Sequence, residues 1–427
     1  MANPADQQPG QQPRQRAHTR REILRAGAGS LALAALAGCS PSLAAPAATP
    51  TPGQAGAVKN AYPDELPPVK IGYLPLLDAT PLLVAHAQGF FAEEGLTAEP
   101  PTLVRSWSQL SEAFMAGSVN LVHLLFPIPI YMRYGLGYPA KVVAWSHMNG
   151  SALTVGQKTG IQSLEDLGGK QIAVPFWYSQ HNVVLQKALR SVGLEPVIQD
   201  RTAKLGARQV NLFVMNPPDM PTALQSGSID GYTVAEPFNA AGELLAGGKI
   251  LRFNGDIWRN HPCCVAVLHE ESVEKRPEWS QRVLNALVKA QVWSGEHKAD
   301  VAKLLSKEGK GYLPTAEPVV TRAMTKYDLD TYGTSGGTGA IRHADWRSAR
   351  ISFQPYPYRS ATALLTTLLK ETQLEGDTRF IQDLDSKRVV DDLVDYRLVG
   401  KAIEKVGGLS RFEGAGGTET RTEEFVV

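Results

Sequence analysis

The sequence has few cysteines, and the three that it has do not form a recognisable pattern. Two of them, Cys263 and Cys264, are adjacent. Adjacent cysteines seldom form a disulfide with each other because the resulting ring is strained. No Cys/His pair has the spacing typical of a zinc site. We therefore expect no disulfide framework, no structural metal and no cofactor.

Charge and hydropathy exclude further classes of protein. The 43 Lys and Arg residues nearly balance the 42 Asp and Glu residues, so the net charge of +1 indicates no nucleic-acid partner. After the N-terminal region no apolar run approaches the length of about 18 residues that suggests a membrane span. The content of 43% hydrophobic and 20% charged residues is ordinary for a globular protein. The length suits two domains or one bilobal protein.

Catalytic signatures are also missing. The sequence contains no Walker A motif, no HExxH, no GxGxxG after a strand, and no GxSxG elbow between a predicted strand and a predicted helix. The carboxylates Asp219, Asp230 and Glu236 lie in one stretch, but such residues more often cap helices and form turns than act as acid–base pairs. We expect a binding protein and not an enzyme.

The most informative segment that is present covers residues 19–39, TRREILRAGAGSLALAALAGC. Arg20 and Arg21 precede a short apolar run that ends in small residues, as in a secretory signal. The arginine pair resembles the twin-arginine export consensus. The ending Leu-Ala-Gly-Cys resembles the bacterial lipobox, which implies removal of residues 1–38 and lipidation of Cys39. An ordinary cleaved signal with a chance arginine pair is the alternative. We expect an exported protein, lipid-anchored at the outer face of the cell membrane or in the periplasm.

Strand and helix patterns alternate between two polar ends. Residues 39–66 are rich in Pro, Ala, Gly and Thr and predict a flexible tether, and residues 413–427 predict a disordered tail. We expect strands at 69–74, 119–125, 141–146, 152–155, 171–176, 210–215 and 231–235. We expect helices at 81–94 with Thr80 as N-cap, and at 106–116, 182–191, 220–226, 278–305, 361–369 and 389–404. This alternation predicts an α/β protein with parallel sheets, in two units.

Several ordered blocks resemble a known family. They are KIGYLPLLDATPLLVAHAQGFFAEEGL, SLEDLGGKQIAVPFWYSQHNVVLQKAL and VNLFVMNPPDMPTALQSGSIDGYTVAEPFNAA. They resemble the substrate-binding proteins of ABC importers for nitrate, bicarbonate, taurine and alkanesulfonates, a group related to thiamine-pyrimidine synthesis proteins. The resemblance implies a monomeric binding component that delivers a small nutrient to a membrane permease and its ATPase.

The resemblance also implies the type II periplasmic-binding-protein fold, in which two α/β lobes joined by two hinge strands close on a ligand. We expect the chain to cross between the lobes near residues 150–155 and to return near 263–269. The first lobe would then comprise residues 67–150 and about 265–405, including added C-terminal helices. The second lobe would comprise residues 151–264.

Polar residues that follow strands are the candidate ligand-binding residues, because open α/β sheets bind ligands at strand carboxyl ends and helix N-termini. The resemblance implies that Trp107 and His181 contact the ligand. The further candidates are Asp78, Thr80, Ser151, Ser179, Asn182, Glu236, Asn239 and Cys264. As alternatives, Trp107 is a core residue, His181 lies on the surface, and Glu236 is a helix cap or an interlobe hydrogen-bond acceptor.

Two departures from the nitrate and bicarbonate binders concern the ligand. That group has a glutamine after Asn-Gly at the first crossing, where this chain has Ser151. It has a lysine two residues after His-Pro, where this chain has Cys263 followed by Cys264. A lysine supplies a full positive charge, whereas a thiol is at most a weak donor. The sequence therefore favours a larger, less charged or amphipathic ligand.

The sequence leaves two other functions open. One is a thiamine-pyrimidine synthase-like enzyme that uses His181 and the cysteine pair with iron. The other is a ligand-sensing lipoprotein whose loaded form docks on a membrane receptor.

Overall fold

The computed structural model describes residues 66–414 and 419–427, which belong to one compact unit. The predicted export residues Arg20 and Arg21, the predicted lipidation site Cys39 and the predicted tether up to residue 65 lie outside the described residues. Among the described helices, none combines the length and apolar character that a membrane span requires.

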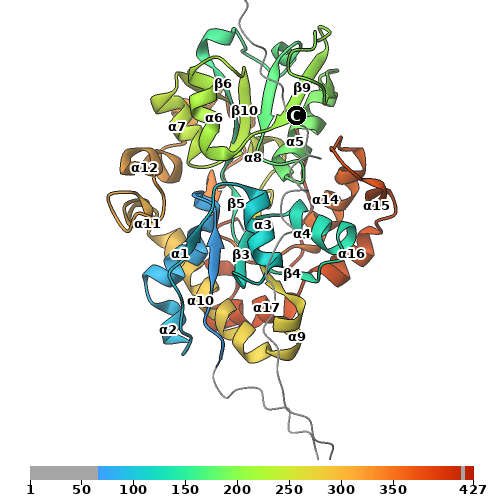
Figure 1. Ribbon diagram of the computed structural model, residues 1–427. Helices are drawn as coiled ribbons and strands as arrows, with labels where there is room; N and C mark the ends of the chain where they lie inside the picture. Colours follow the sequence, from blue (N-terminus) through green and yellow to red (C-terminus); the bar gives the residue numbers. More distant parts are fainter. Residues whose placement is uncertain (1–65, 415–418) are drawn as a thin grey trace, which may run out of the picture. The chain divides into compact units, whose positions relative to one another are not determined.

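Two separate sheets organise the described chain (Figure 1). The first sheet has the order β2-β1-β3-β12-β4. Its strands are β1 (Ile71–Tyr73), β2 (Thr102–Leu103), β3 (Leu121–Leu125), β4 (Ala140–Trp145) and β12 (Cys264–His269). The second sheet has the order β11-β6-β10-β7-β9-β8. Its strands are β6 (Ser151–Gly156), β7 (Gln171–Val174), β8 (Glu195–Val197), β9 (Gln209–Val214), β10 (Gly231–Ala235) and β11 (Gly248–Phe253). We call the parts built on these sheets the first and the second lobe.

The strand directions correct the expectation of purely parallel sheets. β1, β2 and β3 are parallel, but β12 runs antiparallel to both β3 and β4. In the second sheet β6 runs antiparallel to β10 and β11. The reason is topological: β6 and β12 are the strands that arrive from the other lobe. Each enters its sheet at the edge where the parallel strands end, so its first residues lie beside their carboxyl ends.

Both crossings between the sheets contain an asparagine in the left-handed conformation. Asn149 has a φ of 59° and Asn260 a φ of 53°. The Asn149 side chain donates to Asn260 Oδ1 at 3.3 Å and to the Ala349 carbonyl at 2.9 Å. Asparagine tolerates this conformation better than most residues. The next residue, Gly150, also has a positive φ of 69°. The sharp turn into β6 therefore depends on an Asn-Gly pair.

Helices cover both sheets, and several begin where the sequence predicts. In the first two thirds of the chain the longer ones are α1 (Thr80–Ala87), α3 (Trp107–Met115), α5 (Gln180–Ser191), α6 (Met220–Gln225) and α7 (Phe238–Leu245). The short ones are α2 (Phe90–Glu93), α4 (Pro127–Ile130), which continues into a π-helical turn at Tyr131–Gly135, and α8 (Asn254–Ile257).

Two predicted helices are interrupted. The helix expected at 81–94 is divided into α1 and α2 at Gly89, whose φ of 76° ends a right-handed helix. Thr80 is the first residue of α1 and not its N-cap, a position taken by Ala79. The helix expected at 278–305 is divided at His297 into α10 (Pro277–Glu296) and α11 (Lys298–Leu305).

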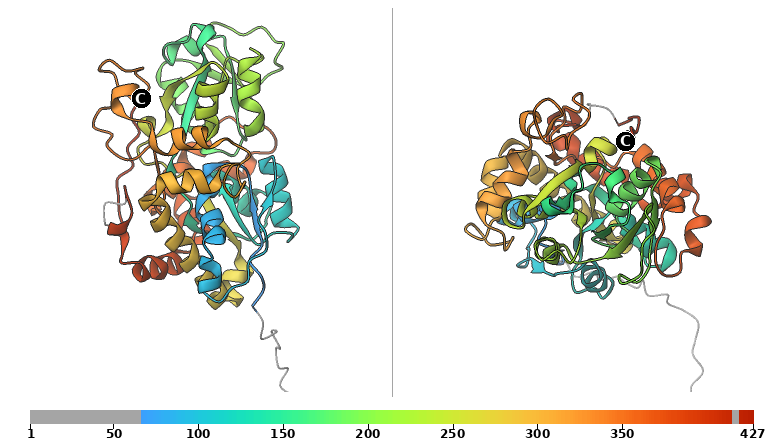
Figure 2. Two further views of the ribbon diagram at one scale, coloured as in Figure 1. Left: turned by 90° about the vertical axis from the view of Figure 1, so that its left-hand side faces the viewer. Right: turned by 90° about the horizontal axis from the view of Figure 1, so that it is seen from above.

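The C-terminal part of the chain adds helices that contact both lobes (Figures 1 and 2). Besides α9 (Glu270–Lys275), they are α12 (Glu317–Thr325), α13 (Leu329–Tyr332), α14 (Arg359–Glu371), α15 (Arg379–Gln382), α16 (Ser386–Leu393) and α17 (Tyr396–Lys405). α12 packs on α7 and α14 on α5 of the second lobe, whereas α16 packs on β4 and α17 on α10 of the first. A short pair, β5 (Met148–Asn149) with β13 (Ile351–Ser352), links the crossing to this part.

The end of the chain does not match the predicted disordered tail. Arg421 lies over the rings of Trp145 and Tyr358, at 5.0 Å and 4.7 Å from their centroids. Phe425 forms a β-bridge with Trp258. Cation–π contacts and backbone pairing fix the described residues 419–427 against the fold, which the polar composition of the tail did not indicate.

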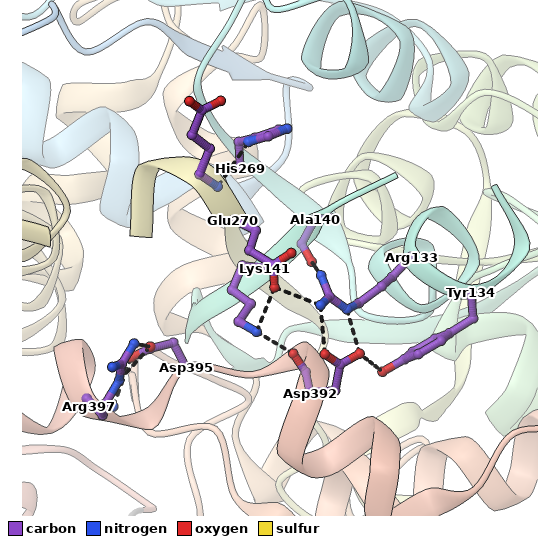
Figure 3. Close-up of polar contacts among 10 residues, drawn as sticks. Arg133, Tyr134, Ala140, Lys141, His269, Glu270, Asp392, Asp395 and Arg397 are labelled. Atoms are coloured by element: carbon purple, nitrogen blue, oxygen red, sulfur yellow. Dashed lines mark hydrogen bonds and ion pairs between the residues drawn. The ribbon is translucent and has the colours of Figure 1, made fainter. Parts of the chain in front are cut away.

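A network of charged side chains attaches α16 to the first lobe (Figure 3). Arg133 forms a bidentate pair with Asp392 at 2.7 Å and also binds Glu270 at 2.7 Å. Lys141 contacts the same Glu270 oxygen at 3.2 Å, and the Tyr134 hydroxyl donates to Asp392 at 2.9 Å. We call these five residues the Arg133 network. All of them except Lys141 line a surface pocket of about 470 Å³ together with residues such as Arg388.

Candidate functional site

Four metal-ligand-type side chains of the first lobe lie together where the parallel strands end. Asp78, His147, Cys263 and Cys264 each place one donor atom within 4.8 Å of the others, and all four residues are fully buried. Cys264 Sγ donates to Asp78 Oδ2 at 2.9 Å, and Cys263 Sγ lies 3.5 Å from the same oxygen. His147 Nε2 lies 3.0 Å from Asp78 Oδ1. We call these four residues the thiol cluster.

The strand topology explains why these residues meet. Asp78 lies in the 3₁₀ turn after β1, at Leu77–Ala79, and His147 follows the end of β4. Cys264 begins β12, which enters the sheet from the second lobe and pairs opposite Leu125 at the end of β3. The antiparallel entry of β12 therefore brings the cysteine pair to the edge where β1 and β4 end.

The second lobe contributes polar side chains to the same place. Gln180 Nε2 donates to Cys263 Sγ at 2.8 Å, and Ser151 Oγ lies 3.4 Å from that sulfur. His181 Nε2 lies 2.9 Å from Ser151 Oγ and 3.9 Å from Cys263 Sγ. Ser151 begins β6, and His181 lies in the first turn of α5. The site is thus built from both lobes, and all of these side chains are buried.

The thiol cluster is strongly polarised. Burial alone raises the pKa of the Cys263 thiol, but the adjacent Cys264 thiol and the attraction of His147 and His181 outweigh burial and hold that pKa well below its ordinary value. Burial lowers the pKa of His147, but Asp78 and Cys263 raise it to about 10. Burial and the charge of Cys263 raise the pKa of Asp78. The cluster therefore favours a thiolate beside an imidazolium.

An aromatic wall adjoins the cluster in the first lobe. Trp107 begins α3 and meets His123 of β3 edge-on, with ring centroids 5.4 Å apart. Burial lowers the pKa of His123 to about 3, so its imidazole is neutral. His123 Nε2 accepts from the Leu74 amide at 3.1 Å, whereas His123 Nδ1 and Trp107 Nε1 have no hydrogen-bond partner.

Glu236 follows β10 at the carboxyl edge of the second sheet, but protein groups bind both of its oxygens. The Tyr327 hydroxyl donates to Oε1 at 2.7 Å, and the Ala240 amide donates to Oε2 at 3.2 Å. Its backbone carbonyl accepts from the Leu77 amide of the first lobe at 2.8 Å. Burial raises the pKa of the Glu236 carboxyl to about 7. These contacts match the cap and interlobe-bond alternative better than a direct ligand contact.

Several predicted ligand-binding residues are engaged within their own elements. Ser179 is the N-cap of α5 and accepts from the Asn182 amide at 3.1 Å. Asn182 donates to the Trp177 carbonyl at 3.0 Å. Asn239 bridges Thr154 and the Val234 carbonyl inside the second lobe. By contrast, Asp78, Ser151, His181 and Cys264 meet in one place, and Thr80 Oγ1 is buried without a hydrogen-bond partner.

Sequence reasoning missed four residues of this site, His123, His147, Gln180 and Cys263, as ligand-binding candidates. His147 follows a predicted strand, which was an available signal of the kind used for the other candidates. Cys263 was considered only in the alternative enzyme, in which His181 and the cysteine pair would bind iron. Nothing in the sequence distinguished Gln180 from a surface residue at the start of a helix.

The fold defines the class of protein. The periplasmic nitrate-binding protein NrtA from Synechocystis superimposes with a TM-score of 0.69 at 19% identity, covering 84% of this chain and 93% of that one. The alkanesulfonate-binding protein SsuA from Xanthomonas axonopodis pv. citri superimposes with a TM-score of 0.52 at 18% identity, covering 78% and 96%. The chain has the two-lobed periplasmic-binding-protein fold, as predicted.

Sequence comparison then gives the family. A sequence model described as the NMT1-like family matches residues 62–306, and the chain belongs to this family. The nitrate/nitrite binding protein NrtA from Nostoc sp. is 26% identical over 381 residues, which cover 84% of this chain and 82% of that protein. The nitrate import ATP-binding protein NrtC from Synechocystis sp. is 25% identical over 358 residues, 79% of this chain but only 50% of that protein.

Proposed function

We propose that the protein is the solute-binding component of an ABC importer and captures a small polar solute between its lobes. The observation that carries the proposal is the convergence of buried polar side chains from the carboxyl edges of both sheets. Trp107 Nε1, His123 Nδ1, Gln180 Oε1 and His181 Nδ1 have no hydrogen-bond partner. A buried polar atom without a partner costs about 1–3 kcal/mol, so such atoms mark places where a ligand binds.

The relatives support this function over an enzymatic one. NrtA and SsuA are named as nitrate-binding and alkanesulfonate-binding proteins, and NrtC as a nitrate import ATP-binding protein. By analogy, the partners of this chain are a membrane permease and its ATPase. Ligand binding would favour the closed lobes by differential affinity and so present a loaded form to the permease.

The residues at the site indicate what kind of solute it binds. None of the described lysines or arginines forms an ion pair with the thiol cluster. Anion binders use such groups to supply positive charge. We therefore disfavour nitrate and bicarbonate for this chain, in agreement with the departures in its sequence.

Ligand release tests the proposal directly. The protein is purified without added solutes, denatured, and its low-molecular-weight contents are identified by mass spectrometry. The stripped protein is then melted with nitrate, bicarbonate, taurine, ethanesulfonate and divalent cations in turn. We expect one of these additions to raise Tm, since a ligand at 100 times its Kd stabilises by about 2.7 kcal/mol. No released ligand and no shift with any addition would contradict solute capture.

We also propose export and lipid anchoring through residues 1–39. The support is the sequence pattern of Arg20, Arg21 and the Leu-Ala-Gly-Cys39 ending. Cys39→Ala should release the protein from the membrane fraction into the soluble extracytoplasmic fraction. A double Arg20→Lys, Arg21→Lys change should retain it inside the cell if export is twin-arginine dependent. A wild-type distribution in both variants would contradict the pair of proposals.

A further inference from the structure

The thiol cluster combines two thiols, one imidazole and one carboxylate from three distant chain segments. We propose that Asp78, His147, Cys263 and Cys264 bind one thiophilic divalent cation, Zn²⁺, between the lobes. This inference rests on the proposed function, because it names the class of solute that the interlobe site recognises. It also revises our expectation of no metal, which considered only spacing along the sequence.

The spacing of the four donor atoms fits a single tetrahedral ion. Zinc binds Cys sulfur at about 2.3 Å and His nitrogen at about 2.0–2.1 Å, which places neighbouring ligands about 3.3–3.8 Å apart. The donor atoms lie within 4.8 Å of one another, with separations of 2.9, 3.0 and 3.5 Å to the two Asp78 oxygens. Small side-chain movements would bring all four to coordination distance. Thiolate and imidazole ligands together favour zinc over Mg²⁺ or Ca²⁺, which prefer oxygen.

Hydrogen bonding within the protein accounts for Asp78 Oδ2 and the Cys263 sulfur but not for the rest of the cluster. Asp78 Oδ1 and His147 Nε2 lie 3.0 Å apart but are not aligned as a hydrogen bond, and neither has another hydrogen-bond partner. His147 Nδ1 also has none. All of these atoms are fully buried. Buried polar atoms that face one another and are only partly hydrogen-bonded are the expected arrangement of a ligand shell.

The ligand set also suits a divalent cation. A metal displaces the protons of its thiol and imidazole ligands, so Cys263 and Cys264 would bind as thiolates and His147 as a neutral group. Among the described residues, Asp78 forms an ion pair only with His147, and no lysine or arginine is paired with the cluster. A divalent ion would therefore offset the charge of its buried anionic ligands.

The second lobe supplies groups that would orient the ligands. Gln180 Nε2 donates to Cys263 Sγ at 2.8 Å, and His181 Nε2 lies 3.9 Å from the same sulfur. Groups that hydrogen-bond to metal ligands orient them and tune affinity. Because these two residues begin α5 while the four ligands belong to the first lobe, metal binding and lobe closure would be coupled.

A metal titration tests the inference on the full chain. The protein is reduced, stripped with a chelator, loaded with Zn²⁺ alone and desalted, and bound metal is counted by mass spectrometry. We expect one ion per chain. Replacement by Co²⁺ should give a near-ultraviolet thiolate-to-metal charge-transfer band, which requires sulfur ligation and needs no variant.

Variants of the cluster residues test whether the bound ion lies in the thiol cluster. The double change Cys263→Ser, Cys264→Ser should weaken Zn²⁺ binding at least 100-fold, and His147→Gln at least tenfold. His297→Gln, a histidine outside the cluster, is the matched control and should bind as wild type. Circular dichroism of the metal-free variants confirms that they are folded. Absence of bound Zn²⁺ in the reduced wild type, absence of the cobalt band, or unchanged binding by the double cysteine variant would each overturn the proposal.

A parallel measurement separates this proposal from the proposed function. The chelator-treated protein is melted with the organic and inorganic anions of the solute panel. A Tm rise with one of them, without Zn²⁺ binding, would overturn the metal site but retain solute capture. Zn²⁺ binding without any decrease of the radius of gyration in solution scattering would support the metal site and contradict closure of the lobes on a solute.

Discussion

In the Arg133 network each charged group contacts an opposite charge, whereas in the thiol cluster the potential negative charges outnumber the positive one. Arg133 binds Asp392 through two nitrogens and Glu270 through one, and Lys141 shares Glu270 (Figure 3). The network lies near the surface, with side-chain exposures between 13% and 36% for its ion-paired residues. The residues of the thiol cluster have no exposure.

The carboxyl groups of the two regions respond to this difference in opposite directions. The bonds from Arg133 outweigh burial and hold the pKa of Asp392 at about 2. In the interlobe site burial dominates, and it raises the pKa of Asp78 and of the neighbouring Glu236. The network thus joins α16 to the first lobe at little cost. The buried carboxyl groups of the interlobe site lower the stability of the fold, as is common at sites that bind ligands.

The largest effect that we predict is a pH dependence produced by Glu236. Its carboxyl ionises near pH 4.5 in the unfolded chain but near pH 7 in the folded protein. Folding therefore favours the protonated Glu236 carboxyl. Its contribution to the free energy of unfolding is fully present below pH 4.5 and is lost as the pH rises through 7. The shift corresponds to about 3 kcal/mol. Glu236→Gln should remove this slope from the free energy of unfolding, measured by urea titration between pH 4.5 and 8.

The matched control for this change is Asp392→Asn. The Asp392 carboxyl of the wild type has a depressed pKa, so its contribution to the free energy of unfolding is present above pH 3.8 and is lost as the pH falls towards 2. The control should therefore keep the wild-type slope between pH 4.5 and 8 and change only the acid limb. Equal slopes for wild type and Glu236→Gln would show that the two regions do not differ in the way proposed.

A smaller effect is expected when the Arg133 network loses its central cation. Arg133→Ala leaves Asp392 and Glu270 close together without the guanidinium and removes four charge-assisted or carbonyl hydrogen bonds. The free energy of unfolding should fall by about 2 kcal/mol, because the group is only partly screened by solvent. Arg133→Lys should recover part of this loss, since it keeps the charge but not the bidentate geometry. A loss below that of an ordinary surface substitution would contradict the structural role of the network.

The smallest change is predicted for Asp78→Asn in the metal-free protein. The substitution leaves the Cys263 thiolate and His147 as a balanced pair, so the free energy of unfolding should stay within about 1 kcal/mol of wild type or rise. With Zn²⁺ added, the variant should gain less stability than wild type because a ligand is missing. A loss as large as that of Arg133→Ala, measured by the same urea titration, would place Asp78 among the stabilising charges.

Much of the fold could be predicted from local sequence. The run Gly231–Ala235 has the predicted bounds of β10, and α3 at Trp107–Met115 lies within the predicted range 106–116, with Ser106 as its N-cap and not its first residue. The antiparallel direction of β12 could not be predicted, because direction depends on which lobe the chain comes from. The packed C-terminal residues were also missed, since their contact through Arg421 involves rings more than 60 residues away.

The site was predictable only in part, for a related reason. A polar residue between a strand and a helix can cap that helix or face the opposite lobe, and both patterns look alike in sequence. Ser179 caps α5, while His181 two residues later lies beside Cys263. Asn239 is bonded within its own lobe. The position of a residue within the first helix turn decides whether its side chain caps the helix or faces the other lobe.

The sequence by itself determined the class of protein. Alternating apolar runs and helix patterns specify two α/β lobes because burial of periodic apolar faces is a local property of each segment. The sequence also contained the cysteine pair and the polar residues after the strands. Only the tertiary structure decided that Asp78, His147 and the pair Cys263–Cys264 form one buried cluster, and that His181 faces it from the other lobe. The physical reason is that β12 crosses back antiparallel, which joins segments more than 180 residues apart at a single sheet edge.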